Sequence, residues 1–168
     1  MFHSLRRPSS PQATSRVRFK SSLLTYCPDT ENGSPQEMIE NKGCTANVVL
    51  VRDGTLYVAN AGDARCVAAI GGKAVALSTD HKPTNSREKQ RVIKAGFSVN
   101  GEGRIDGNLN LSRSIGDLKY KKNKKLRPSE QAITAFPEVK AMTHLGAPGK
   151  KIDFIVLGCD GVWEMKNS

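Results

Sequence analysis

Two turn dipeptides, each set between short apolar runs, constrain the fold of this chain more than any other feature. Asp53–Gly54 and Gly71–Gly72 favour the positive φ angles that a two-residue hairpin turn requires. The runs that flank the turns are rich in β-branched and other apolar residues: Asn47–Val51, Leu56–Ala61, Cys66–Ile70 and Lys73–Leu77. Four short strands within about 30 residues predict an antiparallel meander.

A helix is predicted after these strands, over Ser86–Ala95. Asn85 and Glu88 have the spacing of a capping box, and Gly96 is a residue type that commonly ends a helix. The apolar residues on one face of the helix are few: Val92, Ile93 and Ala95. Such a narrow apolar face predicts a helix that covers the edge or face of a sheet.

Three later runs predict further strands. Ala132–Phe136 and Val139–Thr143 are strand candidates on either side of Pro137. Asp153–Gly158 is a short apolar run, typical of a buried strand. Because the sequence ends soon after this run, at Ser168, we expect that a part of the domain that would follow it is missing.

The length and the charge exclude some classes of protein. The 168 residues fit one domain, and no apolar run approaches the ~18 residues of a transmembrane helix, so no membrane partner is expected. The net charge of +10 is concentrated in two acid-free segments: residues 1–28 hold five basic residues and residues 118–127 hold six. The remainder has 15 basic and 16 acidic residues, which argues against a globally basic nucleic-acid binder.

The first 42 residues differ in composition from the rest. They are rich in Ser, Pro and Arg and have no helical or strand period, which predicts a disordered or irregular tail before a domain of residues 43–168. The Arg- and Ser-rich start also fits a mitochondrial presequence, but Pro8 and Pro11 would interrupt its amphipathic helix. The four scattered cysteines favour a reducing compartment, so we expect the cytoplasm or the nucleus.

The histidines offer no catalytic pattern. His3, His81 and His144 are isolated in the sequence, and each is expected in a surface or turn position. The sequence also has no Gly-rich phosphate loop, no G-x-S-x-G elbow and no H-E-x-x-H motif. Nucleophilic catalysis by a Ser/His/Asp triad is therefore not indicated.

Two carboxylates that follow predicted strands are the candidates for a metal site. Asp63 comes after a strand and a glycine, and Asp160 comes after a strand and before Gly161. Gly161 allows close approach of the backbone and offers its carbonyl oxygen as a ligand. Mg²⁺ and Mn²⁺ prefer oxygen ligands of this kind. The alternative is that each aspartate caps a turn beside a glycine, which is common.

Five segments, taken in order, resemble the motifs of type-2C, metal-dependent Ser/Thr protein phosphatases. They are Gly43–Ala46 (GCTA), Ala59–Arg65 (ANAGDAR), Asp80–Pro83 (DHKP), Gly107–Asp117 (GNLNLSRSIGD) and Gly158–Glu164 (GCDGVWE). Each motif alone is weak, but five in the order of the family, with fitting spacers, make a specific match. The resemblance covers about residues 43–168.

The resemblance implies an α+β fold, a partial phosphatase-2C-like β-sandwich of two antiparallel sheets flanked by helices. It implies a protein phosphatase that acts on phosphoserine and phosphothreonine in a phosphoprotein substrate. It also implies a binuclear Mg²⁺ or Mn²⁺ centre whose bridging water or hydroxide attacks the phosphorus atom in line.

The resemblance also assigns site residues by motif position. Asp160 matches a metal ligand of the binuclear centre, and Asp63 matches an acidic residue linked with a third, weaker metal site. Glu164 stands near that third site, where the family usually has Asp or Asn. Arg113 and Gly161 lie near the catalytic face. The alternative for Arg113 is an ion pair with the nearby Asp117.

Several segments of the family pattern are absent from this sequence. It has no R-x-x-M-E-D-type segment with its phosphate-binding Arg, no D-G-H-G-G motif and no later D-N ligand pair. Of the ligands that the family uses for its binuclear metal centre, Asp160 is then the one that remains, and no catalytic residue is identifiable. One carboxylate cannot hold two divalent ions ~3.5–4 Å apart, so we expect this chain alone to be inactive or nearly so.

Two explanations of these absences are open. The chain is either a fragment of a longer phosphatase, which we favour, or it pairs with a partner chain that completes the sandwich. In both cases we expect open sheet edges and a partly exposed sandwich interior.

Two further functions are open from the sequence. A degenerate phosphatase that has lost its metal ligands would be a non-catalytic phosphoprotein-binding module. The basic run Lys119–Arg127 would suit an anion or nucleic acid, but Tyr120 is its single aromatic residue, so base stacking is thinly supported. A solvated loop that steers acidic substrates is the more economical interpretation, and nucleic acid is not the favoured partner.

Overall fold

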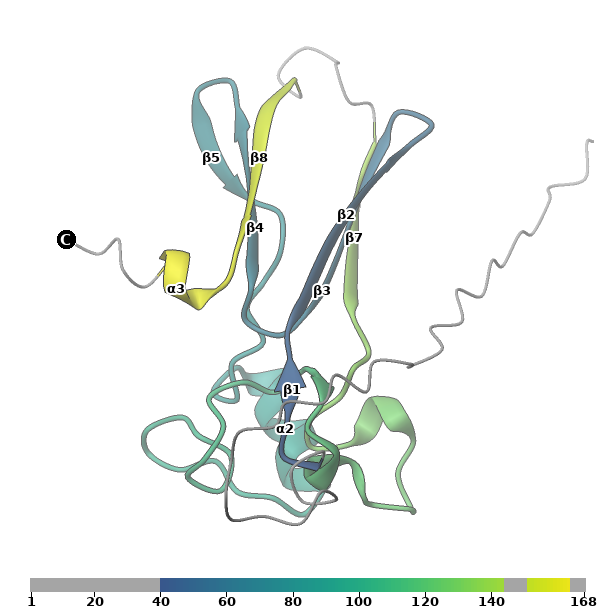
Figure 1. Ribbon diagram of the computed structural model, residues 1–168, viewed down its shortest axis with the longest axis vertical. Coiled ribbons are helices and arrows are strands. Elements are labelled where there is room, and N and C mark those ends of the chain that lie inside the picture. The colour runs from purple at the N-terminus through teal and green to yellow at the C-terminus, as the bar shows by residue number, and fades with distance from the viewer. Residues whose placement is uncertain (1–39, 144–150, 164–168) are drawn as a thin grey trace, which may run out of the picture. The chain divides into compact units, whose positions relative to one another are not determined.

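Six strands form two three-stranded antiparallel sheets in the computed structural model, which describes residues 40–143 and 151–163 (Figure 1). The first sheet has the order β2 (Ala46–Arg52), β3 (Thr55–Ala61) and β7 (Glu138–Met142). The second sheet has the order β5 (Lys73–Ala76), β4 (Arg65–Ile70) and β8 (Ile152–Gly158). We call these two sheets the sandwich.

One hydrophobic core joins the two sheets. Its buried members are Leu56 and Val58 from β3, Cys66 and Ala68 from β4, and Leu77 after β5. Alternate residues of β3 and β4 supply this core, as the two-residue period of a half-buried strand requires. The expected α+β fold with two stacked antiparallel sheets is confirmed.

Both predicted hairpin turns are confirmed. Asp53 and Gly54 have φ angles of 49° and 68° between β2 and β3. Gly71 and Gly72 have φ angles of 57° and 74° between β4 and β5. Two positive φ angles in succession give the turn a twist that matches the twist of the strands beside it.

The prediction of a single meander is wrong, because the four strands are divided between the two sheets. β3 pairs with β2 and β7, whereas β4 pairs with β5 and β8. The chain leaves the first sheet at Gly62, where φ is 128°. The buried Asn60 side chain donates to the carbonyl oxygens of Gly62 and Thr79, at 3.0 and 2.9 Å, and so stabilises this corner.

The predicted helix is confirmed as α2 (Ser86–Lys94), and Gly96 follows it with a φ of 95°. The predicted capping box is wrong: the Asn85 side chain makes no capping hydrogen bond, and the Glu88 side chain is buried in the interior. The apolar face of α2 packs on the segment that follows it and not on a sheet. The buried members of this second core are Val92, Ala95, Ile105, Tyr120, Ala132 and Ile133. We call α2 and residues 97–136 the helix–loop layer.

The helix–loop layer has mostly irregular backbone outside α2. Its short described elements are β6 (Ile115–Gly116), which pairs with β1 (Gly43–Cys44), and the 3₁₀ helices η1 (Leu118–Lys121) and η2 (Pro128–Glu130). The β1–β6 pair is very close, because a Cβ atom at Gly116 would lie 2.3 Å from the Lys42 carbonyl oxygen. No helix within the described ranges is long and apolar enough to cross a membrane.

One predicted strand is not formed. The segment Ala132–Phe136 makes a single parallel β-bridge, between Thr134 and Arg113, and no longer strand pairing. Ala132 and Ile133 are completely buried in the second core, so burial and not strand pairing explains their apolar character. The neighbouring candidate, Val139–Thr143, is confirmed as β7 with slightly shifted bounds.

The outer face of the β2–β3–β7 sheet is apolar and exposed in the described structure. The strand register brings four large apolar side chains to this face: Val48, Leu50, Tyr57 and Val139, which are 55%, 55%, 39% and 59% exposed. The opposite face of β3 holds Leu56 and Val58, which are buried. This sheet is therefore apolar on both faces.

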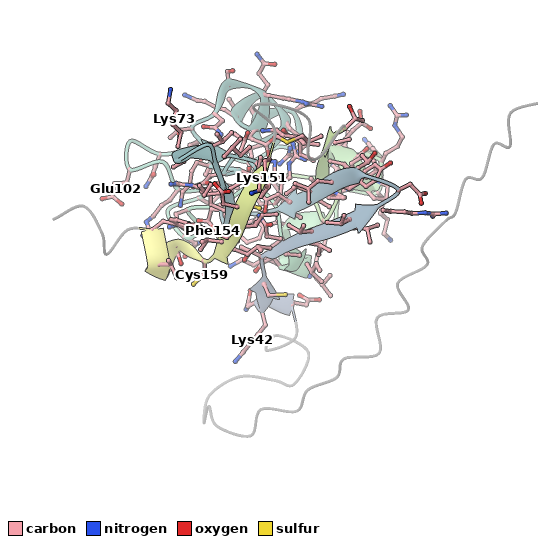
Figure 2. All side chains as sticks on the ribbon, turned by 90° about the horizontal axis from the view of Figure 1, so that it is seen from above. Lys42, Lys73, Glu102, Lys151, Phe154 and Cys159 are labelled. Atoms are coloured by element: carbon pink, nitrogen blue, oxygen red, sulfur yellow. The ribbon has the colours of Figure 1, made fainter. Side chains whose placement is uncertain are left out.

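β8 is an edge strand of the described structure. The prediction that this strand is buried is therefore wrong for the described residues. Phe154 on its outer face is 63% exposed (Figure 2). Leu157 lies opposite the buried Cys66 and so faces the sandwich interior, yet it is 45% exposed. The expectation of open sheet edges and a partly exposed interior is confirmed for the described residues.

Candidate functional site

Two of the residues predicted to bind metal lie at the same end of the β4–β8 ladder. Arg65 at the start of β4 pairs with Gly158 at the end of β8, so Asp63 and Asp160 each lie two residues beyond this antiparallel pair. The ladder has its irregularity at the opposite end, between Ala69 and Ile70. Both aspartates follow strands, as their sequence context indicates.

Asp160 begins the short helix α3 (Asp160–Trp163). Its Oδ1 accepts a hydrogen bond from the Gly161 N–H at 2.8 Å, and its side chain is half-buried. Trp163 Nε1 donates to the Gly158 carbonyl oxygen at 2.8 Å, and the Trp163 ring lies 5.7 Å from the guanidinium carbon of Arg65. These contacts hold the start of α3 against the end of the ladder.

Asp63 is buried and already has a cationic partner. The side chain is 5% exposed, and Lys82 Nζ lies 2.6 Å from its Oδ2. A charge-assisted hydrogen bond of this length neutralises most of the carboxylate charge without a metal ion. Lys82 comes from the DHKP segment, so two of the five motifs meet in this ion pair.

The described residues do not fit a two-metal centre. Glu164, the third residue predicted to lie near metal, is outside the described residues. Within residues 40–143 and 151–163, no three or more side chains of His, Cys, Asp or Glu are grouped so that they could hold a metal ion. A two-metal centre needs several oxygen ligands around ions that lie ~3.5–4 Å apart.

Arg113 forms a buried ion pair with Glu88. Its Nη2 lies 2.6 Å from Glu88 Oε1, its Nε lies 3.1 Å from Oε2, and its Nη1 donates to the Phe136 carbonyl oxygen at 3.1 Å. The predicted alternative, an ion pair with Asp117, is wrong, because Asp117 accepts instead from the Ser114 hydroxyl at 2.5 Å. Since Arg113 is only 6% exposed, its guanidinium joins parts of the helix–loop layer instead of facing solvent.

Glu88 is the centre of a buried polar cluster that the sequence analysis did not find. Its Oε2 lies 2.8 Å from Arg91 Nη1 and 2.7 Å from Ser112 Oγ. Burial alone would raise the pKa of Glu88, but the hydrogen bonds from Arg113 and Ser112 and the charges of both arginines lower the pKa to about 2. The i, i+3 spacing of Glu88 and Arg91 is a local signal of this cluster. The contact with Arg113, 25 residues away, has no such signal.

His81 is buried, so a surface position is wrong for it. It is 2% exposed, and its Nδ1 lies 3.0 Å from the Gly62 carbonyl oxygen. Its own carbonyl oxygen accepts from the Ser112 N–H at 2.9 Å, so it connects the corner of the sandwich to the helix–loop layer. Burial is the largest cause that lowers the pKa of His81, and the positive charge of Arg113 lowers it further. His3 and His144 lie outside the described residues.

Two stacked antiparallel sheets, with aspartates at the end of one ladder, define a sandwich of the kind that metal-dependent phosphatases have. A family model described as Protein phosphatase 2C matches residues 3–168 of this chain. The chain therefore belongs to the protein phosphatase 2C family, whose members are Ser/Thr protein phosphatases that generally depend on Mg²⁺ or Mn²⁺.

Relatives and solved structures agree with this family. Probable protein phosphatase 2C 3 of Paramecium tetraurelia is 54% identical over 125 residues, which are 74% of this chain and 40% of the relative. A phosphatase of Toxoplasma gondii matches with a TM-score of 0.55 at 36% identity, over 66% of this chain and 33% of that chain. Serine-threonine phosphatase 2C of the same organism has a TM-score of 0.60 over 77% of this chain and 45% of that chain, at 21% identity, which shows the fold alone. The chain spans about 40% of the length of the first curated relatives it matches.

Proposed function

We propose that this chain takes part in the hydrolysis of phosphoserine and phosphothreonine in phosphoprotein substrates, as part of a metal-dependent protein phosphatase. The observation that carries the proposal is the position of Asp63 and Asp160 at one end of the β4–β8 ladder, in a chain of the protein phosphatase 2C family. In this proposal Asp160 supplies an oxygen ligand to Mg²⁺ or Mn²⁺, with the Gly161 carbonyl beside it. Asp63 and Glu164 belong to a third, weaker metal site, and Arg113 supports the catalytic face from within.

We also propose that the 168-residue chain alone is inactive or nearly so. Among the described residues, Asp63 is already paired with Lys82, and Asp160 has no cluster of further carboxylates or imidazoles around it. The assay is hydrolysis of para-nitrophenyl phosphate by the purified chain in millimolar Mn²⁺. We expect no turnover above that of buffer with Mn²⁺. Turnover that disappears in an Asp160→Asn variant would contradict inactivity and support the role of Asp160.

Metal binding by Asp160 is tested without turnover. Mn²⁺ is paramagnetic, so a bound ion broadens the NMR signals of nearby amides. We expect millimolar Mn²⁺ to broaden the Gly161 amide signal in the wild-type chain and not in Asp160→Asn. Asp153→Asn is the matched control, because Asp153 is an exposed aspartate on β8, the strand that precedes Asp160. Equal broadening in wild type and Asp160→Asn would exclude Asp160 as a ligand.

The alternative function is a non-catalytic module that binds phosphoproteins. The observation in its favour is that Lys82 neutralises Asp63 in the described structure, so this carboxylate does not require a metal ion. The test is fluorescence polarisation with a phosphoserine peptide and its serine counterpart. Preference for the phosphorylated peptide without any turnover would favour this module over the phosphatase.

The domain division, the compartment and the partner chain are also part of the proposal. We propose a tail over residues 1–42, of which residues 1–39 lie outside the described ranges, and a domain over 43–168. The cytoplasm or nucleus is supported by the free thiols of Cys44, Cys66 and Cys159, which are typical of a reducing compartment. A mitochondrial location would depend on residues 1–28, outside the described ranges. A partner chain that completes the sandwich would cover the exposed edges and faces of the two sheets.

A further inference from the structure

A groove of about 710 Å³ lies in the helix–loop layer, and neither Asp63 nor Asp160 is among the described residues that line it. Its volume is in the range of ~300–1,000 Å³ that is usual for ligand-binding clefts. The apolar part of its lining is formed by Leu126, Pro128, Phe136 and Pro137. Phe136 is 64% exposed, so a large aromatic side chain is available in the groove for a bound partner to cover.

Buried polar side chains hold the walls of this groove in place. Gln131 is 6% exposed; its Nε2 donates to the Asn123 carbonyl oxygen at 2.7 Å, and its Oε1 accepts from the Asn123 N–H at 3.1 Å. Thr134 Oγ1 donates to the Pro128 carbonyl oxygen at 2.8 Å and accepts from the Phe136 N–H at 3.1 Å. The groove is therefore preformed, which lowers the entropic cost of binding.

The groove is basic on one side. Lys121, Lys122 and Lys124 belong to its lining, and no Asp or Glu is found among the described residues that line it. Lys121 Nζ donates to the Ser114 carbonyl oxygen at 2.7 Å, and Lys122 Nζ pairs with Glu40 Oε2 at 2.5 Å. Lys124 is exposed. A ligand with carboxylate groups is complementary to this side.

An apolar floor beside basic residues favours a peptide over a nucleic acid. Binding of single-stranded nucleic acid depends on aromatic side chains that stack on successive bases. Tyr120, the one aromatic residue of the basic run, is 2% exposed and packs on the Phe97 ring at a centroid distance of 5.4 Å. It is therefore not available for stacking, and Phe136 is the single aromatic residue among the described residues that line the groove.

We infer that this groove is a docking site for an acidic peptide segment that carries an aromatic or branched aliphatic anchor. The anchor packs on Phe136 and Pro128, and an acidic residue beside it faces Lys124, while a second competes with Glu40 for Lys122. The preformed apolar floor gives affinity, and the lysines select against basic segments. The inference goes beyond the proposed function, since it does not depend on phosphate hydrolysis by this chain.

The test is fluorescence polarisation of a labelled synthetic peptide with a central Phe-Leu pair between two runs of Glu, measured with the full 168-residue chain. Two comparison peptides have Ser-Gly in place of the Phe-Leu pair, or Lys in place of Glu. We expect measurable binding of the first peptide and at least about 10-fold weaker binding of each comparison peptide.

Two variants locate the binding in the groove. Phe136→Ala removes the exposed anchor surface, and Lys124→Glu reverses one charge of the lining. Phe154→Ala and Lys73→Glu are the matched controls, because Phe154 on β8 and Lys73 on β5 are also exposed but do not line the groove (Figure 2). We expect each groove variant to weaken binding about 10-fold or more, and each control to change it less than about 2-fold. Near-UV circular dichroism of each variant checks that the fold is retained.

Three outcomes would overturn the inference. The first is no binding of the acidic peptide by the wild-type chain. The second is the same loss of affinity in Phe154→Ala as in Phe136→Ala, which would move the anchor site to β8. The third is tighter binding of single-stranded oligothymidylate, with a steep dependence on salt and loss in Lys124→Glu, which would assign the groove to nucleic acid.

Discussion

The sandwich and the helix–loop layer differ in how completely they bury their apolar residues. The sandwich has regular strands and confirmed turns, yet its described outer face and edges expose Val48, Leu50, Phe154 and Leu157. The helix–loop layer has mostly irregular backbone, yet Val92, Ile105 and Ile133 in it are completely buried. Regular secondary structure therefore does not by itself give complete burial in this molecule.

The two regions differ in whether their own contacts are enough to bury their apolar residues. In the helix–loop layer, Arg113 pairs with Glu88 of α2 and donates to the Phe136 carbonyl oxygen. Contacts within the layer therefore hold its parts together. The sandwich satisfies its strand hydrogen bonds within each sheet, but the outer face of a sheet needs a covering layer to be buried. The five predictions that follow test this difference, from the largest expected effect to the smallest.

The largest effect is expected for Arg113→Met. The substitution leaves the Glu88 carboxylate buried with one of its two arginine partners removed, which costs about 3–5 kcal/mol of unfolding free energy. The measurement is urea denaturation combined with hydrogen exchange of the α2 amides. Arg127→Met is the control, because Arg127 also pairs with a glutamate, Glu130, but its side chain is 82% exposed. A loss in Arg113→Met no larger than in Arg127→Met would show that the helix–loop layer does not depend on this ion pair.

The next effect is expected from cavities. Ile133→Ala removes a completely buried side chain of the helix–loop layer and should cost about 2–5 kcal/mol of unfolding free energy. Leu50→Ala removes a side chain that is 55% exposed on the sandwich and should cost less than about 1 kcal/mol. Thermal unfolding of both variants measures the difference. If Leu50→Ala is the more costly, the outer face of the sandwich is covered in solution.

A third effect is the loss of stability at acidic pH through Glu88. The pKa of Glu88 in the folded chain is about 2, below its ordinary value of 4.5, so its contribution is fully present above about pH 4.5 and is lost as the pH falls toward 2. Between about pH 6 and about pH 3, the unfolding free energy should fall by about 2 kcal/mol from this group. NMR titration of the Glu88 side-chain carboxyl carbon checks the cause, and a midpoint near 4.5 would contradict it.

The lowered pKa of His81 acts in a higher pH range. Because its folded pKa lies below 6.5, the unfolded chain binds the proton first, and stability is lost as the pH falls below about 6.5. The His81 loss therefore begins at a higher pH than the Glu88 loss. The histidine ring signals in the same NMR experiment follow His81 directly.

The smallest effect on stability is expected for polar substitutions on the outer face of the sandwich. Val48→Thr and Val139→Thr replace exposed side chains and should change the unfolding free energy by less than about 1 kcal/mol. They should also reduce self-association, which sedimentation velocity measures, because they break an exposed apolar surface. Val58→Thr is the control: Val58 is 3% exposed, and its buried hydroxyl should cost about 1–3 kcal/mol. Unchanged association in the two surface variants would mean that this face is not the contact surface.

The sequence predicted the parts of the fold that depend on neighbouring residues. The Asp53–Gly54 and Gly71–Gly72 turns and the end of α2 at Gly96 follow from the conformational freedom of glycine and aspartate in short segments. The change of sheet at Gly62 was not predicted, because hydrophobic alternation reports which face is buried and not which strand lies beside it.

The candidate site was predictable to a smaller extent. That Asp63 and Asp160 follow strands was visible in the sequence, but their position across one ladder depends on the Arg65–Gly158 register. The buried position of His81 and the Glu88–Arg113 ion pair depend on contacts 19 and 25 residues apart, which leave no local pattern. The capping-box pattern was misleading because the buried arginine competes for the same Glu88 carboxylate.

The irregularity between Ala69 and Ile70 in the β4–β8 ladder has a consequence for how this part of the molecule tolerates change in length. Because the pairing shifts at the end of the ladder far from Asp63 and Asp160, an added or deleted residue near Ile152 can be absorbed there. The same change near Gly158 would either slip the pairing by one position and turn Ile155 outward, or keep the pairing and displace Asp160 by one residue. One end of this ladder is therefore open to length variation, while the other must keep its residue count.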